Sequence, residues 1–297
     1  MTDGTDNMSA RDDLAGAEAD FAAVRRRLFG IAYRMLGSVA EAEDVLQDVW
    51  IRWQTYDRTT VENPGAFLAT TTTRMAINVL QSARVRRETY IGPWLPEPVD
   101  TSADPLLGAE RGEALEFAVM MLLERLTPTE RAAYVLREAF VYPYEQIAEI
   151  IQQSQANVRQ LVSRARVHLA VEKRAAIASS EQKRLLDAFI SAAQTGNVTA
   201  LEQLFAADVV SYSDGGGAVR ASKFPVVGRE RVAKYLHAFA TTFWTGVTVA
   251  PVDLNGQPSA RLSYEGQVLA VLSLTASSDG IEQIMWMMNP AKLRAVA

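Results

Sequence analysis

The chain has no cysteine and only two histidines, His168 and His237. The missing thiol excludes disulfide bonds, cysteine-ligated zinc and thiol catalysis. Two histidines are too few to favour a histidine-based metal centre, so we expect neither a metal nor a cofactor.

Long apolar runs are also missing. No run approaches the roughly 18 residues that a membrane-spanning helix needs. The first residues, MTDGTDNMSARDD, lack a basic start followed by an apolar core, so they do not resemble a secretion signal. We therefore expect a cytoplasmic protein that makes no membrane contact.

Charge is distributed unevenly along the chain. The net charge is −5, which by itself argues against nucleic acid as a partner. Acidic residues crowd the first twenty positions, which we interpret as a flexible acidic tail, and basic residues gather later at Arg25-Arg26-Arg27, at Arg84, Arg86 and Arg87, and at Arg159, Arg164 and Arg166. Local clusters matter more than the sum for phosphate contact. For any one cluster alone, a solvated helix face is the better interpretation.

Residues 21–92 are predicted to form a first helical domain. Apolar residues recur there at three- and four-residue spacing, as in a helix with one buried face. Gly37 ends the first helix, and Ser38 with Glu41 predicts a capping box that begins the second. Pro64 suits the first turn of a third helix.

Residues 93–112 interrupt this pattern and are predicted to be a linker. The segment Pro93-Trp94-Leu95-Pro96-Glu97-Pro98 has three prolines in six residues, which neither a helix interior nor a central strand tolerates. Its apolar Trp94 and Leu95 indicate that it docks on another part of the chain.

Residues 113–176 are predicted to form a second helical domain that ends in a helix-turn-helix. Thr127-Pro128-Thr129-Glu130 is a strong helix start. Helices over 144–151 and 155–171, with Ser154 as the cap of the second, match the motif whose second helix enters the major groove. Amides and a guanidinium group near the start of that helix suit contacts with base edges; these residues are Gln155, Asn157, Arg159 and Gln160. Arginines further along suit contacts with phosphates; these are Arg164 and Arg166. An ordinary helical hairpin with a polar outer face is the alternative.

Residues 177–297 change character and predict an α+β domain. Two helical stretches precede a strand that ends in the turn Asp214-Gly215-Gly216-Gly217. A further helix and several strands follow, with hairpin signals at Asn255-Gly256 and Asp279-Gly280. The expected fold class is multidomain: two all-α domains followed by an α+β domain.

The order of motifs over residues 21–172 resembles the extracytoplasmic-function sigma factors. The motifs are Ala42-Glu-Asp-Val-Leu-Gln-Asp-Val-Trp50, an arginine-containing helix, Leu126-Thr-Pro-Thr-Glu-Arg131 and the helix-turn-helix. The resemblance implies that the first domain (region 2) binds core RNA polymerase and the −10 promoter element, and that the second (region 4) binds the −35 element.

By position, the resemblance assigns roles within region 2. Core polymerase, through its β and β′ subunits, would meet Asp44, Gln47, Asp48 and Trp50; a solvated helix face with Trp50 in the core is the alternative. The loop 55–63 would take a flipped −10 base, and the promoter strand would meet Arg74, Asn78, Arg84, Arg86 and Arg87.

The third domain resembles the cone-shaped SnoaL-like (NTF2-like) fold, which sigma factors of the SigJ type carry as an extension. That group shares linker and C-terminal motifs, here Trp94, Leu95 and Pro96; Asp214 and Gly215; and Asn289, Pro290, Lys292 and Leu293. Ala291 departs from the usual acidic residue. The resemblance implies regulation in cis by the extension, so that no dedicated anti-sigma factor is expected, and it leaves room for an unknown small ligand in the cone.

Catalysis in the third domain would need a poised acid or base. The available groups are Asp214, Tyr212, His237 and Tyr264. Turn formation explains Asp214, and a structural role explains His237, so we expect no catalytic residue and no enzyme. Two other functions stay open: a ligand-sensing helix-turn-helix regulator, and a SnoaL-like isomerase or cyclase fused to a helical module.

Overall fold

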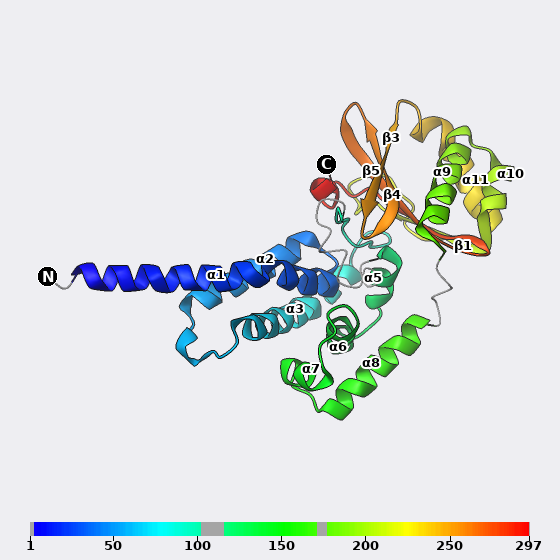
Figure 1. Cartoon of the computed structure of the whole chain (residues 1–297). Helices are drawn as coiled ribbons and strands as arrows, with labels where there is room; N and C mark the ends of the chain where they lie inside the picture. The colour runs from blue at the N-terminus through cyan, green and yellow to red at the C-terminus, as the bar shows by residue number, and fades with distance from the viewer. Residues whose placement is uncertain (1–2, 102–115, 171–176, 297) are drawn as a thin grey trace. The chain divides into compact units, whose positions relative to one another are not determined.

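The computed structural model describes residues 3–101, 116–170 and 177–296 (Figure 1). The side chains of 3–13, 83–88 and 170 also lie outside this description. The chain divides into two compact units. The helical unit comprises Met1–Arg84 and Leu126–Arg166, and the sheet unit comprises Val85–Arg125 and Val167–Ala297.

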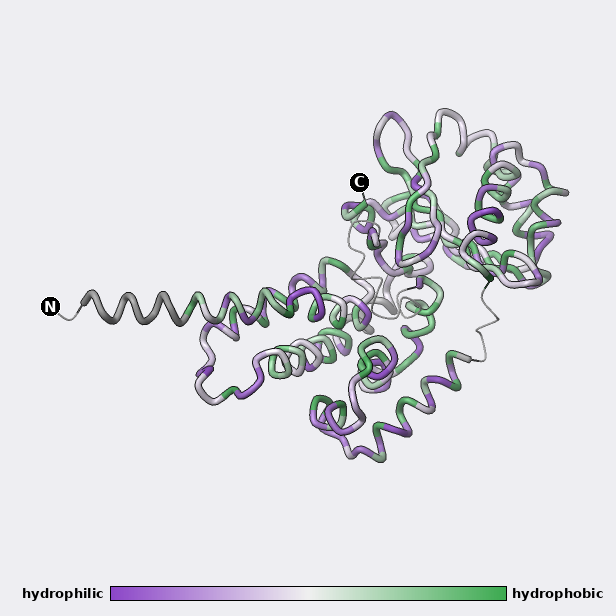
Figure 2. Tube along the Cα trace, in the orientation of Figure 1, coloured by the Kyte–Doolittle hydropathy of each residue, from purple (hydrophilic) through white to green (hydrophobic). Residues whose placement is uncertain are grey.

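The helical unit is built from helices that the apolar spacing predicts. Their bounds are α1 (Asp3–Leu36), α2 (Val39–Thr55), the 3-10 turn η1 (Arg58–Thr60), α3 (Pro64–Glu88), α6 (Pro128–Glu138), α7 (Tyr144–Ile151) and α8 (Gln155–Ala170). Figure 2 shows polar and apolar residues alternating along α8, as one-sided burial requires. None of the described helices is long and apolar enough to cross a membrane.

Two predicted helix starts are confirmed by their caps. The Ser38 side chain accepts a hydrogen bond from the backbone of Glu41 at the start of α2, and Gly37 ends α1 with a φ of 67°. The start of α6 is a complete capping box, in which Thr127 and Glu130 satisfy each other's backbone N–H groups.

The first twenty residues differ from the expected flexible tail, since α1 begins at Asp3. The reason lies at the helix surface facing α2. Ala17 is fully buried, and its carbonyl accepts a hydrogen bond of 3.1 Å from the indole N–H of the fully buried Trp53. The end of the acidic segment thus contributes to the core.

The two helical stretches of the chain share one unit because α6 and the segment after it pack on α1. Arg131 is buried and donates to the backbone carbonyl of Arg34 at 3.1 Å. Arg27 donates to the carbonyl of Phe140 and lies over its ring. Burial lowers the pKa of Arg131 to about 9, because a guanidinium loses hydration there.

The sheet unit contains a six-stranded sheet and the helices that cover it, which confirms the expected α+β fold. Its described elements are α5 (Phe117–Leu123), α9 (Ser179–Thr195), α10 (Val198–Leu204), β1 (Phe205–Asp214), β2 (Val226–Val227), α11 (Arg229–Phe243), β3 (Thr248–Leu254), β4 (Gln257–Tyr264), β5 (Gln267–Ser277), β6 (Gly280–Met287) and η3 (Leu293–Val296). The strand order is β2-β1-β6-β5-β4-β3. Strands β1 and β6 are parallel, and the other neighbours are antiparallel.

Both faces of the sheet are apolar in its centre. Leu272 of β5 and Trp286 of β6 belong to the core under α9, α10 and α11. Their neighbours Val271 and Met285 point to the opposite face, where they join a second cluster with Leu95 and Phe117. Since side chains alternate along a strand, this pattern requires a cover on each face. Leu95 and Phe117, together with Leu293 and Val296 of the tail, cover the second face, which we call the linker face.

We expect Phe189→Ala to destabilise the sheet unit by about 3 to 5 kcal/mol. Phe189 is fully buried and packs against Phe205 and Trp286, with ring centroids 6.1 and 6.0 Å away. Phe239→Ala is the matched control, since Phe239 on α11 is 45% exposed. Hydrogen exchange of β5 and β6 peptides in the full chain measures the difference. Equal protection in both variants would contradict the assignment of this core.

Candidate nucleic-acid interface and linker clamp

The helix-turn-helix is present where the sequence predicts it. Helix α7 ends at Ile151, and its C-cap Gln152 turns the chain with a left-handed φ of 54°. Ser154 then caps α8, because its hydroxyl accepts a hydrogen bond of 3.2 Å from the backbone N–H of Asn157. Ile147 and Val158 are fully buried between the helices. This packing determines which face of α8 is turned toward α7 and which face is turned toward solvent.

The side chains predicted to contact bases lie at the start of α8. Gln155, Arg159 and Gln160 are exposed. Asn157 is half-buried and donates to the side chain of Gln153 at 2.7 Å. The guanidinium of Arg159 lies 5.5 Å from the ring centre of Tyr144 on α7. The helix therefore presents amides and one guanidinium together.

The two arginines predicted to contact phosphates face carboxylates of α6. Arg166 pairs with Glu138 at 2.7 Å, and Arg164 with Glu130 at 3.4 Å. The hydrogen bond to Glu138 raises the pKa of Arg166. Both arginines are more than half exposed, whereas the side chains of Glu130 and Glu138 are only 11% and 22% exposed.

A hollow of about 370 Å³ lies between α2 and α3 and brings together two of the predicted −10 residues, Arg74 and Asn78. The remaining lining residues are Arg52, Tyr56, Phe67, Thr71 and Met75. The rings of Tyr56 and Phe67 are 4.5 Å apart. Aromatic rings beside guanidinium groups are suited to an unstacked base.

The loop 55–63 beside this hollow is held by its own polar contacts. Asp57 accepts from the backbone and hydroxyl of Thr59, which begins the turn η1. Arg58 donates to the carbonyl of Trp53 at 2.9 Å. Arg84, Arg86 and Arg87, the other predicted −10 residues, have side chains outside the described set.

Arg74 is engaged within the helical unit. Its guanidinium donates to the carbonyls of Ile150 at 2.8 Å and Glu149 at 3.0 Å, at the C-terminal end of α7. The negative end of a helix dipole favours a cation at this place. The structure thus joins a predicted −10 residue to the first helix of the helix-turn-helix, which the sequence did not indicate.

The predicted polymerase-binding residues lie on the surface of α2. Asp44, Gln47 and Asp48 are exposed. Trp50 is half-buried, and its ring centre lies 5.2 Å from that of Phe21. The tryptophan in the core is Trp53 instead. This face has the acidic, amide and aromatic groups expected of it.

In the sheet unit, a buried carboxylate ties the linker to the sheet. Asp214, at the end of β1, is fully buried. It accepts from the hydroxyl of Tyr90 at 2.5 Å, the backbone N–H of Leu95 at 2.9 Å and the ammonium of Lys292 at 2.8 Å. We call these four residues the linker clamp. Turn formation therefore explains Asp214 only in part, since its side chain faces the linker and the tail.

Neighbouring groups complete the clamp. Lys292 also donates to the carbonyl of Leu95 at 2.5 Å and lies 4.2 Å from the ring centre of Trp94. The side chain of Asn289 donates to the Tyr90 oxygen at 2.8 Å. Burial, together with the hydrogen bond to Asp214, raises the pKa of Tyr90. This hydroxyl therefore stays a donor at neutral pH.

The glycines after Asp214 are required by this packing. A Cβ on Gly216 would overlap the side-chain nitrogen of Asn289 and lie 2.8 Å from the Tyr90 oxygen, and the φ of Gly216 is 58°. A Cβ on Gly215 would lie 2.6 Å from the carbonyl of Val219. The turn is thus shaped to admit the linker and the tail.

The other motif residues take different positions around the clamp. Pro96 and Leu293 are buried, whereas Pro290 is exposed. Leu293 joins the cluster on the linker face with Leu95.

A second attachment involves residues that sequence reasoning missed. Asn255 is fully buried and exchanges two hydrogen bonds with the backbone of Val99, each 2.9 Å long. The backbone N–H and the hydroxyl of Thr101 both donate to the carbonyl of Asp253, and the hydroxyl accepts from the backbone N–H of Gly256. Asn255-Gly256 gave a hairpin signal, which is correct, but that signal cannot show that the asparagine side chain holds another segment.

Two of the candidate acid and base groups of the third domain, His237 and Asp214, contact other segments of the domain, and a third, Tyr264, lies at the surface. His237 Nδ1 lies 2.7 Å from the carbonyl of Gly196, beside the end of α9. Tyr264 is 42% exposed, and Asp214 belongs to the clamp. Within the part of the chain that the structure describes, no cluster of three or more acidic or histidine residues could hold a metal ion.

Comparisons with known protein families match both helical stretches of the sequence. Residues 21–86 match the family "Sigma-70 region 2", and residues 116–169 match "Sigma-70, region 4". A curated relative, the ECF RNA polymerase sigma factor SigJ of Mycobacterium tuberculosis, is 36% identical over 77% of this chain and 75% of its own length. The crystal structure of SigJ superimposes with a TM-score of 0.75 at 29% identity, covering 93% of this chain and 98% of that one.

Two further proteins are similar. The probable ECF RNA polymerase sigma factor SigI of M. tuberculosis is 30% identical over 96% of this chain and 97% of its own length. A co-crystal structure of the sigma factor RpoE with the anti-sigma factor NepR from Bartonella quintana matches over 52% of this chain with a TM-score of 0.40, which is too low to transfer its partner. The matched regions, their order and the identity to SigJ and SigI show that this chain belongs to the extracytoplasmic-function RNA polymerase sigma factors, which direct RNA polymerase to promoters.

Proposed function

We propose that the C-terminal α+β domain regulates this sigma factor in cis by holding the linker between regions 2 and 4. The observation that carries the proposal is the linker clamp. One buried carboxylate, Asp214, receives donors from Leu95 of the linker, from Tyr90 just before the linker and from Lys292 of the tail. The linker conformation therefore depends on the C-terminal domain.

The free energy needed to release the linker depends on the burial of the ion pair between Lys292 and Asp214. The side chains of Lys292 and Asp214 are 7% and 0% exposed. Removing one partner of a buried ion pair costs about 3 to 5 kcal/mol, because the other charge stays buried without compensation. A release of the linker would require that both groups regain solvent or new partners, so the clamp suits a switch with two discrete states.

Promoter contact forms the second part of the proposal. The start of α8, with Gln155, Asn157, Arg159 and Gln160, would read the −35 element, while Arg164 and Arg166 meet phosphates. The hollow with Arg74 and Asn78, helped by Arg84, Arg86 and Arg87, would take the −10 strand. Asp44, Gln47, Asp48 and Trp50 would bind the polymerase core.

The contact between Arg74 and α7 gives this proposal a conformational step. The guanidinium donates through Nε and Nη2 to the carbonyls of Ile150 and Glu149, and these two N–H groups would reach a promoter strand only after leaving α7. The helical unit would therefore open when polymerase and promoter bind. Regulation by a covalently attached domain removes the need for a dedicated anti-sigma factor, and the protein would act in the cytoplasm without catalytic turnover.

We expect Asp214→Asn to loosen the linker. The substitution keeps the shape of the side chain but leaves Lys292 buried without its counter-ion, which costs about 3 kcal/mol. Hydrogen exchange of the Leu95 amide should therefore accelerate about a hundredfold. Asp279→Asn is the control, since Asp279 lies in an exposed turn of the same domain.

The same two variants test the regulation itself. Promoter-specific transcription in vitro, with purified core polymerase and the full chain, should differ at least severalfold between Asp214→Asn and wild type. It should not change in Asp279→Asn. A loosened linker with an unchanged transcript level would refute regulation by the clamp.

We expect Gln155→Ala and Arg166→Ala to weaken promoter binding in different ways. Loss of a base contact should cost about 1 to 3 kcal/mol and relax the preference at one base pair. Loss of a phosphate contact should weaken binding to all sequences and reduce the salt slope of log K by about 0.9. Holoenzyme titrations at several salt concentrations, on a promoter mapped by in vitro transcription, separate the two.

The control for this pair is Gln146→Ala, which removes an exposed amide from α7 and not from the start of α8. Binding equal to wild type is expected. If Gln155→Ala kept full sequence preference, the assignment of base contacts to the start of α8 would be wrong.

A further inference from the structure

The segment between β1 and α11 carries cations and an exposed aromatic ring at the surface of the sheet unit (Figure 1). Residues 215–229 include Arg220, Lys223 and Arg229 and no aspartate or glutamate, although the whole chain has a net charge of −5. All three cations are exposed and form no ion pair with any residue that the structure describes. We call residues 215–229 the cationic loop.

The ring of Phe224 projects from this loop. It is 78% exposed, more than any other large apolar side chain that the structure describes. The loop holds it in place, because the hydroxyl of Ser222 donates to the carbonyl of Phe224 at 2.7 Å and the next residues, Val226 and Val227, pair with β1. An exposed ring contributes nothing to the core, so stability does not explain this position.

The cationic loop lies against the chain that leads out of region 2. A Cβ on Gly92 would lie 3.7 Å from the carbonyl oxygen of Ser222 and 3.9 Å from the Cα of Lys223. A Cβ on Gly217 would lie 3.0 Å from the side chain of Ile91. The match to region 2 ends at residue 86, and the six residues from there to Gly92 reach at most about 20 Å. The loop is therefore close to the arginine-rich end of α3, the proposed contact of the promoter strand.

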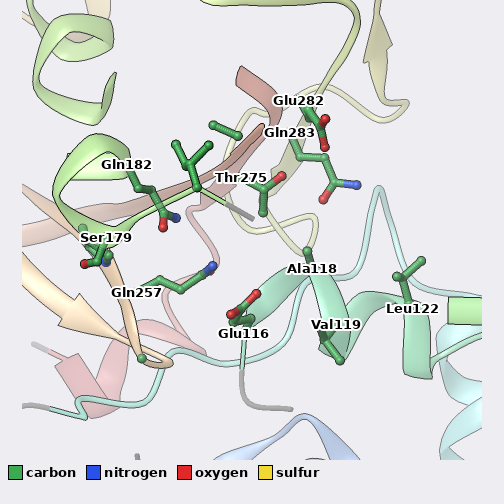
Figure 3. Close-up of a pocket in the computed structure, with 14 residues that line it drawn as sticks. Glu116, Ala118, Val119, Leu122, Ser179, Gln182, Gln257, Thr275, Glu282 and Gln283 are labelled. Atoms are coloured by element: carbon green, nitrogen blue, oxygen red, sulfur yellow. The ribbon is translucent and has the colours of Figure 1, made fainter. Parts of the chain in front are cut away.

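The loop is separate from the hollow drawn in Figure 3. That hollow is lined by residues of α5, α9, β4, β5 and β6 and their neighbours, and none of its lining residues belongs to the cationic loop. The fold does not need the charges either, since Arg229 is the first residue of α11, where the helix dipole disfavours a cation. Cations and ring thus form an open surface, which suits an extended partner.

The chemistry of this surface favours single-stranded DNA. Cations without carboxylate partners attract phosphates. An exposed aromatic ring stacks on a base only where the base has left the duplex, and such stacking together with nearby cations is how proteins hold single strands. An acidic protein surface would also meet the cations, but the nearness of the end of region 2 favours the promoter strand.

We propose that the cationic loop binds single-stranded promoter DNA next to the −10 element. Arg220, Lys223 and Arg229 would contact phosphates, and Phe224 would stack on a base. The strand would pass from the arginine-rich end of α3 onto the C-terminal domain, which would then be part of the promoter-binding surface. This inference rests on the proposed promoter contact of region 2 and not on regulation through the linker clamp.

Fluorescence anisotropy of a labelled oligothymidylate, titrated with the full chain at several salt concentrations, measures the contact. Phe224→Ala should weaken binding about tenfold through lost stacking, whereas Phe224→Trp should keep it. Lys223→Ala should reduce the salt slope of log K by about 0.7, the value for one phosphate of a single strand. The matched controls, Phe239→Ala on α11 and Lys183→Ala on α9, change exposed residues and should bind as wild type does.

A second measurement identifies the partner within the polymerase complex. Phe224 is replaced by the photocrosslinker p-benzoylphenylalanine, and holoenzyme is bound to a promoter fork with one unpaired strand. Illumination should crosslink position 224 to that strand, and the same replacement of Phe239 should give no crosslink to DNA. A crosslink to the β or β′ subunit alone would overturn the inference, because the loop would then be a protein contact.

Failure of this inference differs from failure of the proposed −10 contact. If Arg86→Ala weakened binding of the oligothymidylate and Phe224→Ala did not, the contact of region 2 would stand and the cationic loop would have no part in it. The reverse result would support the loop and remove Arg86 from the strand contact. Since Phe224 is exposed, Phe224→Ala should keep the thermal midpoint of wild type, so weaker binding would report the lost ring and not unfolding.

Discussion

The buried pair of Asp214 and Lys292 is the interaction on which the arrangement of the sheet unit depends. A carboxylate can be fully buried only if its charge and its lone pairs find partners. Lys292 supplies the charge, and Tyr90 and Leu95 supply further donors. Three segments far apart in the chain therefore meet at one group, because none of them alone could bury it.

The two-faced sheet explains why the linker must dock. In β5 and β6, alternate side chains are apolar on both faces, and α9, α10 and α11 can cover only one of them. Without Leu95 and Phe117, the residues Val271, Met285 and Met287 would form an exposed apolar patch. The C-terminal domain thus uses the linker as part of its own core.

The polar contacts of the described chain fall into two classes of strength. Arg164 and Arg166 are themselves more than half exposed and pair with carboxylates that are 11% and 22% exposed. The clamp is buried and costs several kcal/mol to break. This difference fits a protein whose DNA-facing residues exchange partners easily and whose linker changes state only when a strong constraint is released.

The sequence by itself determined the helices, the helix-turn-helix and the α+β class of the third domain, since caps, periodicity and turn residues are local signals. The motif residues around Asp214 came from the resemblance to a family and not from such signals. Tertiary structure alone decided that α1 begins at Asp3, that Arg74 donates to the end of α7, and that Tyr90 and Asn255 hold the linker. It also showed that Asp214 serves the clamp and not merely a turn. The contacts of Arg74, Tyr90, Asn255 and Asp214 join residues more than 70 positions apart, and the contact of Ala17 with Trp53 spans 36. No local pattern records such contacts, because burial and partner choice are fixed only when distant segments pack.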